Sequence, residues 1–255
     1  MRIWDVSAGY LNRQSLLGEH RELHGLHVIV TEGRIGYARH PETLRWVRAL
    51  GGLRWRHALL AAEMRLRGYH DGTPLRLDRR RMAWPETFVT APLDQLRLLR
   101  QKYVGREHGR IPLPRNPQEL WAHHKYSVMA RDPEAYRRIG RSVATARAGA
   151  DMAPLVRELV MLLREPPPPG RAVNALEHMW GYVRPLAAAE DRAATAQGPA
   201  AFLAAIQRLA VRHRVGFLLS STALSELAPY VRSSSARLPR SESPRIRPPR
   251  PSAAR

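Results

Sequence analysis

Apolar residues recur at spacings of three and four along most of the chain, which is the pattern of amphipathic helices. A first helix is predicted over residues 16–30 and ends at Gly33, because glycine readily adopts the left-handed conformation that closes a helix. A second helix is expected from Pro41 to the pair Gly51-Gly52, and a third over 53–66. No segment alternates apolar and polar residues as a half-buried strand would. The pattern therefore predicts an all-α fold.

The later part of the chain repeats this helical pattern. Further helices are predicted at 93–103, 117–130, 133–147, 152–164, 172–183, 199–213 and 215–231. The turn-rich segment 105–117 separates two groups of helices, so we predict helical domains at 1–118 and 119–232. The remaining residues 233–255 are rich in Arg, Pro and Ser and poor in apolar side chains. They are predicted to form a disordered basic tail.

The composition adds a large positive charge to this helical picture. The 255 residues include 42 Lys and Arg against 22 Asp and Glu, which gives a formal net charge of +20. Only Lys102 and Lys125 are lysines, a preference for arginine that a GC-rich genome could explain, although genome composition does not explain the surplus itself. The surplus favours a polyanionic partner, with nucleic acid ahead of an acidic membrane.

Other classes of protein are disfavoured by what the sequence lacks. There is no cysteine, which excludes disulfides, thiolate metal sites and a cysteine nucleophile. No apolar run approaches the roughly 18–20 residues that span a bilayer, and the first residues lack the apolar run of a signal peptide. We therefore expect a cytoplasmic monomer with no membrane partner.

Candidate chemistry gathers in the first twenty-two residues. They combine an amino terminus at Met1 with Arg2, Arg21 and Glu22. An α-amino group has an ordinary pKa of about 7.7–8.0, against about 10.4 for lysine, so part of it is unprotonated near neutral pH. A carboxylate beside such an amine could support Schiff-base chemistry on a sugar carbon.

Three histidines in the same region offer an alternative chemistry. His20, His24 and His27 are spaced so that they could share one face of a helix, and two histidines four residues apart are a common metal-binding pair. The sequence has no metalloprotease motif and shows no further ligand beside them. We therefore predict core and DNA-facing histidines, with no metal site and no cofactor.

Several N-terminal features resemble the endonuclease V type of pyrimidine-dimer DNA glycosylase in order and spacing. The resemblance covers residues 1–75 well and 76–118 loosely. The matching features are the basic Arg2, Gln14-x-x-Leu17, Arg21-Glu22-Leu23, the stretch 33–37, His40-Pro41 and Arg67-Gly68-Tyr69.

The resemblance implies an all-α domain that acts on cyclobutane pyrimidine dimers in duplex DNA. In that family the N-terminal α-amine attacks the sugar C1′ of the 5′ pyrimidine, the glycosidic bond breaks, an imine forms and β-elimination cuts the strand. By analogy, the catalytic residues are Met1, which should be retained because Arg2 is too large for methionine removal, and Glu22, which assists the sugar chemistry. The residues that the resemblance assigns to DNA binding are Arg2, Gln14, His20 and Arg21.

The second half resembles a different family, the YbgA-type helical domain, whose biochemical activity is not established. This resemblance covers residues 119–232. It rests on Lys125-Tyr126-x-x-Met129-Ala130, Pro133-x-x-Tyr136-Arg137, Gly140-Arg141 and Asn174-x-Leu176-x-His178-x-x-Gly181-Tyr182.

The sequence thus predicts a bacterial, nucleoid-associated repair enzyme, a pyrimidine-dimer DNA glycosylase with apurinic/apyrimidinic lyase activity. Its expected partner is duplex DNA that contains ultraviolet lesions. Two alternatives stay open on the sequence alone. One is a non-catalytic nucleic-acid-binding protein with the same fold. The other is an enzyme whose chemistry on nucleic acid resides in the C-terminal domain.

Overall fold

The computed structural model describes residues 1–77, 82–147, 149–168 and 170–231. Within these ranges the chain is helical and contains no strand, which confirms the predicted all-α fold. The predicted basic tail at 233–255 lies outside the described residues. None of the helices in the described ranges is both long and apolar enough to cross a membrane.

Long connections at 67–91 and 103–116 separate α3 from α4 and α4 from α5, most other connections are shorter, and two short 3₁₀ turns accompany the helices. The α-helices are α1 (Arg13–Glu32), α2 (Pro41–Trp46), α3 (Leu50–Leu66), α4 (Pro92–Lys102), α5 (Pro117–Met129), α6 (Pro133–Ala144), α7 (Ala153–Arg164), α8 (Arg171–Val183), α9 (Ala189–Ala194), α10 (Pro199–Arg212), α11 (Gly216–Leu219), α12 (Ala223–Glu226) and α13 (Ala228–Val231).

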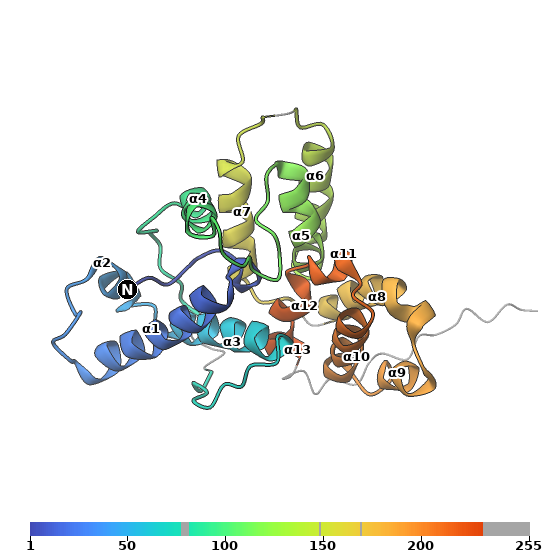
Figure 1. Ribbon diagram of the computed structural model, residues 1–255, viewed down its shortest axis with the longest axis horizontal. Coiled ribbons are helices and arrows are strands. Elements are labelled where there is room, and N and C mark those ends of the chain that lie inside the picture. The colour runs from blue at the N-terminus through green and yellow to red at the C-terminus, as the bar shows by residue number, and fades with distance from the viewer. Residues whose placement is uncertain (78–81, 148, 169, 232–255) are drawn as a thin grey trace, which may run out of the picture.

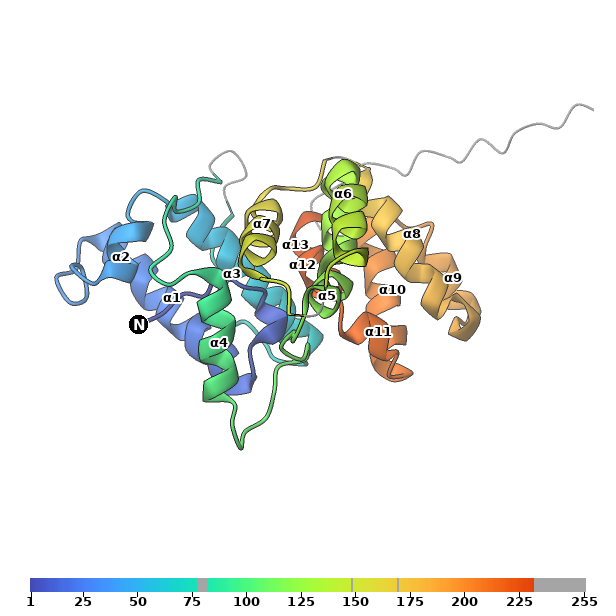
Figure 2. The same cartoon turned by 90° about the horizontal axis from the view of Figure 1, so that it is seen from above.

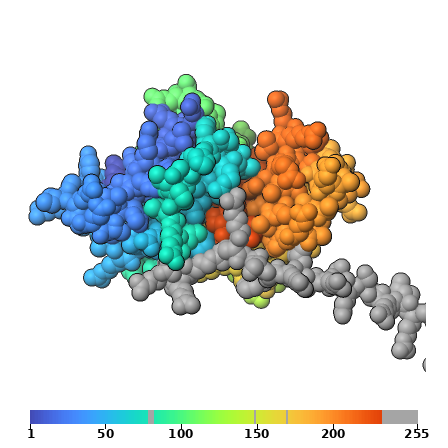
Figure 3. All heavy atoms as spheres, turned by 90° about the horizontal axis from the view of Figure 1, so that it is seen from below, coloured from blue at the N-terminus to red at the C-terminus, as the bar shows by residue number. Residues whose placement is uncertain are grey.

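The helices form two lateral groups with a third group between them. Helices α1–α4 lie on one side and α8–α11 on the other, while α5, α6 and α7 stand between them (Figures 1 and 2). The space-filling view from below shows the N-terminal residues and the orange C-terminal helices on opposite sides (Figure 3). The last helices, α12 and α13, return to pack against α3.

Two hydrophobic cores hold these groups together. The first joins the N-terminal helices to α5, α6 and α7, and includes Leu120, Ile139 and Leu159 beside residues such as Leu23 and Leu60. The second lies under α8, α10 and the C-terminal helices. Because the first core extends well past residue 118, the two predicted helical domains share buried surface. The domain limits themselves stay a prediction.

Helix α1 agrees with the predicted first helix, whereas the boundary between α2 and α3 differs from the prediction. The Asn12 side chain accepts a hydrogen bond from the Ser15 N–H at 2.9 Å at the start of α1, and Gly33 closes it at φ 67°. The prediction that Gly51-Gly52 ends the second helix is wrong, because both glycines lie in the first turn of α3. A Cβ on Gly52 would lie 2.5 Å from the Ala83 carbonyl oxygen, so close backbone approach explains this glycine.

The apolar stretch 215–231 is not the single predicted helix. It forms α11, α12 and α13, three short helices separated by breaks. At the first break Thr222 turns toward α5, where its N–H and hydroxyl both donate to the His123 carbonyl oxygen at 2.9 and 3.1 Å. Hydroxyl side chains that bond to backbone groups compete with helix continuation in this way.

Candidate active site

The N-terminal segment runs alongside α1 and is held there by two carboxylates. The Arg2 backbone N–H donates to the Glu22 carboxylate, and the Trp4 N–H donates to Glu19 at 3.1 Å. Glu19 and Glu22 are three residues apart, so they lie on one side of α1. This pairing places the Glu22 carboxylate against the first peptide unit of the chain.

Glu19 anchors this arrangement from inside the protein. Its carboxylate is buried and forms a bidentate pair with Arg56 of α3, at 2.7 and 2.8 Å. Arg56 also donates to the Val6 carbonyl oxygen at 2.9 Å, so one guanidinium holds both α1 and the N-terminal segment. Burial raises the pKa of Glu19 and Arg56 opposes this rise. The sequence analysis missed Glu19, although its place in the apolar stripe of α1 with Leu16 and Leu23 was a usable signal.

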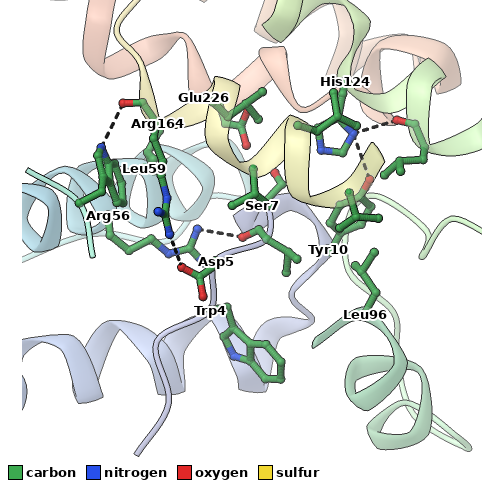
Figure 4. Close-up of a pocket in the computed structure, with 17 residues that line it drawn as sticks. Trp4, Asp5, Ser7, Tyr10, Arg56, Leu59, Leu96, His124, Arg164 and Glu226 are labelled. Atoms are coloured by element: carbon green, nitrogen blue, oxygen red, sulfur yellow. Dashed lines mark hydrogen bonds and ion pairs between the residues drawn. The ribbon is translucent and has the colours of Figure 1, made fainter. Parts of the chain in front are cut away.

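Asp5 fixes the other side of the N-terminal segment. Its carboxylate accepts from Arg45 at 3.0 and 3.1 Å and from Gln95 at 2.8 Å. It also pairs with Arg164, at the end of α7, at 2.8 Å (Figure 4). Three separate helices therefore fix a residue only three positions after Arg2.

An open cleft of about 510 Å³ lies beside the Arg2–Glu22 contact. It is bounded by the N-terminal segment, α1 and the C-terminal end of α4. The lining residues are Arg2, Trp4, Gln14, Ser15, Gly18, Glu19, Glu22, Leu98, Gln101 and Lys102. The cleft thus combines a carboxylate, two cations and an aromatic face next to the start of the chain.

Three of the six predicted site residues, Arg2, Gln14 and Glu22, line this cleft. Arg2 lies over the Trp4 ring at 5.1 Å and donates to the Thr90 hydroxyl at 3.2 Å. Gln14 accepts from Arg106 at 3.2 Å. Arg21 is exposed on the surface of α1. Arg2, Gln14 and Glu22 are therefore brought together at the cleft, and Arg21 is exposed on the same helix. Met1 does not line the cleft and packs against the first hydrophobic core.

His20 is placed differently. It is directed toward a group formed by His24, His57 and Asp71, and its side chain is only 12% exposed. It does not line the cleft. Its predicted contact with DNA is thus not part of the arrangement around Glu22.

A second cavity lies beneath the N-terminal segment and is enclosed. Its volume is about 40 Å³, and its walls come from both the N-terminal segment and the later helices, including Tyr10, His124 and Glu226 (Figure 4). A space of this size holds a water molecule or two but no nucleotide. The open cleft is the candidate substrate site because Arg2, Gln14 and Glu22 line it.

The motif residues of the second half form a group of their own on α5, α8 and α11. The Tyr182 ring stacks on Phe217 at 4.7 Å, and the Tyr126 hydroxyl donates to the Tyr182 hydroxyl at 3.3 Å. The Lys125 ammonium lies 4.5 Å from the Phe217 ring centre, and His178 stacks on Tyr126 at 6.5 Å. This basic and aromatic group lies outside the set of residues that line the cleft.

Comparison with protein families assigns the two regions. Residues 1–77 match the family described as pyrimidine dimer DNA glycosylase, and residues 125–211 match a family described as a protein of unknown function (DUF1722). Neither the comparison with curated proteins nor that with solved structures finds a match. The first match contains the N-terminal segment, α1 and α3, while the α4 wall of the cleft lies beyond it.

Proposed function

We propose that this chain, whose residues 1–77 match the family described as pyrimidine dimer DNA glycosylase, excises pyrimidine dimers from ultraviolet-damaged duplex DNA through a Schiff base on its N-terminal amine, and then nicks the strand by β-elimination. The observation that carries the proposal is the hydrogen bond from the Arg2 N–H to Glu22. It holds a carboxylate against the peptide unit that follows the α-amine, at the edge of an open cleft.

The chemistry follows from these two groups. The Met1 nitrogen forms a bond to C1′ of the damaged nucleotide, and the glycosidic C1′–N bond breaks with its electron pair leaving on the base. Loss of a proton from nitrogen and opening of the sugar ring then give the imine. Removal of a C2′ proton expels the 3′ phosphate oxygen and cuts the strand. Glu22 can accept the proton from the attacking amine and stabilise positive charge that develops on the sugar.

The surrounding contacts prepare the amine for attack. Trp4 is tied to α1 and Asp5 to α2, α4 and α7, so the chain is anchored three residues after Met1. This anchor limits how far the amine can move from Glu22. Holding a nucleophile and its base in place before the substrate arrives removes an entropic cost from the chemical step. This explains why so many buried ionic contacts converge on a short terminal segment.

The cleft also supplies features that suit damaged DNA. Arg2 and Lys102 line it, and Arg106 and Arg21 lie near its rim on exposed surface. These cations can bind phosphates and help offset the cost of bending the duplex and unstacking a base. The net charge of +20 favours the same partner.

The test is borohydride trapping on ultraviolet-irradiated duplex DNA. The wild-type protein should give a covalent protein–DNA adduct, and Glu22→Gln should lower its rate of formation at least tenfold. The matched control is Glu32→Gln, an exposed carboxylate at the far end of the same helix, which should trap like the wild type. Failure of the folded wild-type protein to trap irradiated DNA would overturn the proposal, and equal trapping by Glu22→Gln would remove Glu22 from it.

A further inference from the structure

Three imidazoles and a carboxylate converge on the side of α1 that faces away from the cleft. His20 and His24 come from α1, His57 from α3, and Asp71 from the segment that follows α3. On an α-helix, residue 20 lies about half a turn around from residue 18, which lines the cleft. This group, which we call the histidine cluster, is therefore separate from the candidate active site.

The ligand-type atoms of the histidine cluster are close together. The Nε2 atoms of His24 and His57 are 3.1 Å apart, and His20 Nε2 lies 3.3 Å from the Asp71 carboxylate. The other Asp71 oxygen is 3.7 Å from His57 Nε2. Each of the four residues has one such atom, and these four atoms all lie within 4.8 Å of one another.

Two features of the cluster call for a further partner. The side chains of His57 and Asp71 are only 2% and 7% exposed, so their polar atoms have little access to water. His20 Nε2 is buried and, apart from its 3.3 Å approach to the Asp71 carboxylate, has no hydrogen-bond partner among the described residues, whereas His24 Nε2 also lies 3.2 Å from the Thr73 hydroxyl. Buried polar atoms are almost always satisfied, and an ion is one of the few explanations for one that is not.

We propose that His20, His24, His57 and Asp71 bind a divalent transition-metal ion, with Zn²⁺ the best fit. Imidazole nitrogen and carboxylate oxygen are common zinc ligands, and four of them complete a tetrahedral site. Ligands bound at about 2.0–2.1 Å in a tetrahedron are separated by roughly 3.3 Å. The shorter separations in the cluster already match this spacing, and none of the others exceeds 4.8 Å.

The site has a structural role. Four protein ligands leave no position open for water or substrate, which is typical of structural rather than catalytic zinc. The ion joins α1 to α3 and fastens the segment that carries Asp71 to both. The sequence predicted only core and DNA-facing histidines because it showed no further ligand near His20 and His24. The other two ligands, His57 and Asp71, lie 33 or more residues after His24.

Metal titration of the full-length protein tests this site independently of DNA chemistry. Protein stripped with a chelator should bind one equivalent of Co²⁺ with the strong visible absorption of a tetrahedral complex, and one equivalent of Zn²⁺ should displace it. His57→Gln and Asp71→Asn should each weaken Co²⁺ binding at least tenfold. His27→Gln is the matched control, because His27 is on the same helix but contacts Arg54 instead.

Circular dichroism establishes that each variant is folded before it is titrated. If His57→Gln does not fold, Asp71→Asn decides the question, since Asp71 lies outside the helices. The proposal is overturned if the stripped wild-type protein binds no stoichiometric Co²⁺ or Zn²⁺. It is equally overturned if folded Asp71→Asn binds both ions as tightly as the wild type does.

Discussion

Arg164, the last residue of α7, forms a 2.8 Å ion pair with Asp5, although 159 residues separate them. The Arg164 guanidinium also donates to the Pro85 carbonyl oxygen at 2.9 Å and lies over the Phe88 ring at 4.9 Å. The second half of the chain therefore takes part in fixing the N-terminal segment that carries the proposed nucleophile. This gives the later helices a physical connection to the candidate active site without assigning them any chemistry.

Removing Arg164 should affect both stability and trapping. Arg164→Met leaves the buried Asp5 carboxylate with fewer partners, and breaking a buried ion pair typically costs about 3–5 kcal/mol. The remaining contacts from Arg45 and Gln95 should reduce this to about 2 kcal/mol in urea unfolding. The trapping rate should fall because the segment is looser. Arg157→Met, an exposed change on the same helix, is the control, and equal behaviour of the two variants would contradict this role.

Glu19 should act as a positioning residue for the N-terminal segment. Glu19→Gln keeps the size of the side chain but leaves the buried Arg56 guanidinium without its counter-charge, which should destabilise the protein by about 3 kcal/mol. The trapping rate should fall while the affinity for irradiated DNA changes little, because Glu19 holds the Trp4 amide rather than the DNA. A variant that lost affinity in proportion to rate would instead place Glu19 among the DNA contacts.

Acid should destabilise the fold through Glu63. This carboxylate is buried between Arg67 and Arg110, with contacts of 2.7 Å to each. Burial alone would raise its pKa, but Arg110 and Arg67 outweigh burial and hold the pKa at about 2, below the ordinary 4.5. The folded state therefore has the lower pKa, so the stabilisation is complete above about pH 4.5 and is lost as the pH falls toward 2.

The corresponding variant makes this measurable. The unfolding free energy of the wild type should fall as the pH drops from about 4.5 to 2. In Glu63→Gln this fall should be smaller, and the variant should be less stable than the wild type at neutral pH. Urea unfolding across this range gives the comparison, with the exposed Glu177→Gln as control. Identical pH profiles for wild type and Glu63→Gln would contradict the assignment.

DNA binding should depend on salt and on the lysine in the cleft. Lys102→Gln removes one cation from the cleft, so the slope of log affinity against log salt should fall in magnitude by about one. The other lysine provides the comparison, because Lys125 belongs to the separate aromatic group on α5. If only Lys125→Gln reduced the salt slope, the nucleic-acid binding site would have to be assigned to the second half of the chain.

The sequence predicted some of these features and not others for identifiable reasons. Helix α1 was recognisable from its periodicity and from Gly33. The family resemblance singled out Arg2, Gln14 and Glu22, which line the cleft, while the catalytic role of Glu22 beside the amine stays a prediction. Glu19–Arg56 spans 37 residues and Asp5–Arg164 spans 159, so only the packing of α1, α3 and α7 brings these pairs together. The same holds for the histidine cluster, where local spacing revealed only the two ligands on α1.

Peptide mapping of the borohydride-trapped adduct tests the central claim most directly. Lysine occurs only at Lys102 and Lys125, so three amines at most compete for the imine, and Lys102 lines the same cleft as Glu22. The account predicts that the sugar is attached to the α-nitrogen of Met1, and that acetylation or extension of the amino terminus abolishes trapping while salt-sensitive DNA binding persists. An adduct on Lys102 or Lys125, or trapping that survives a blocked amino terminus, would contradict it.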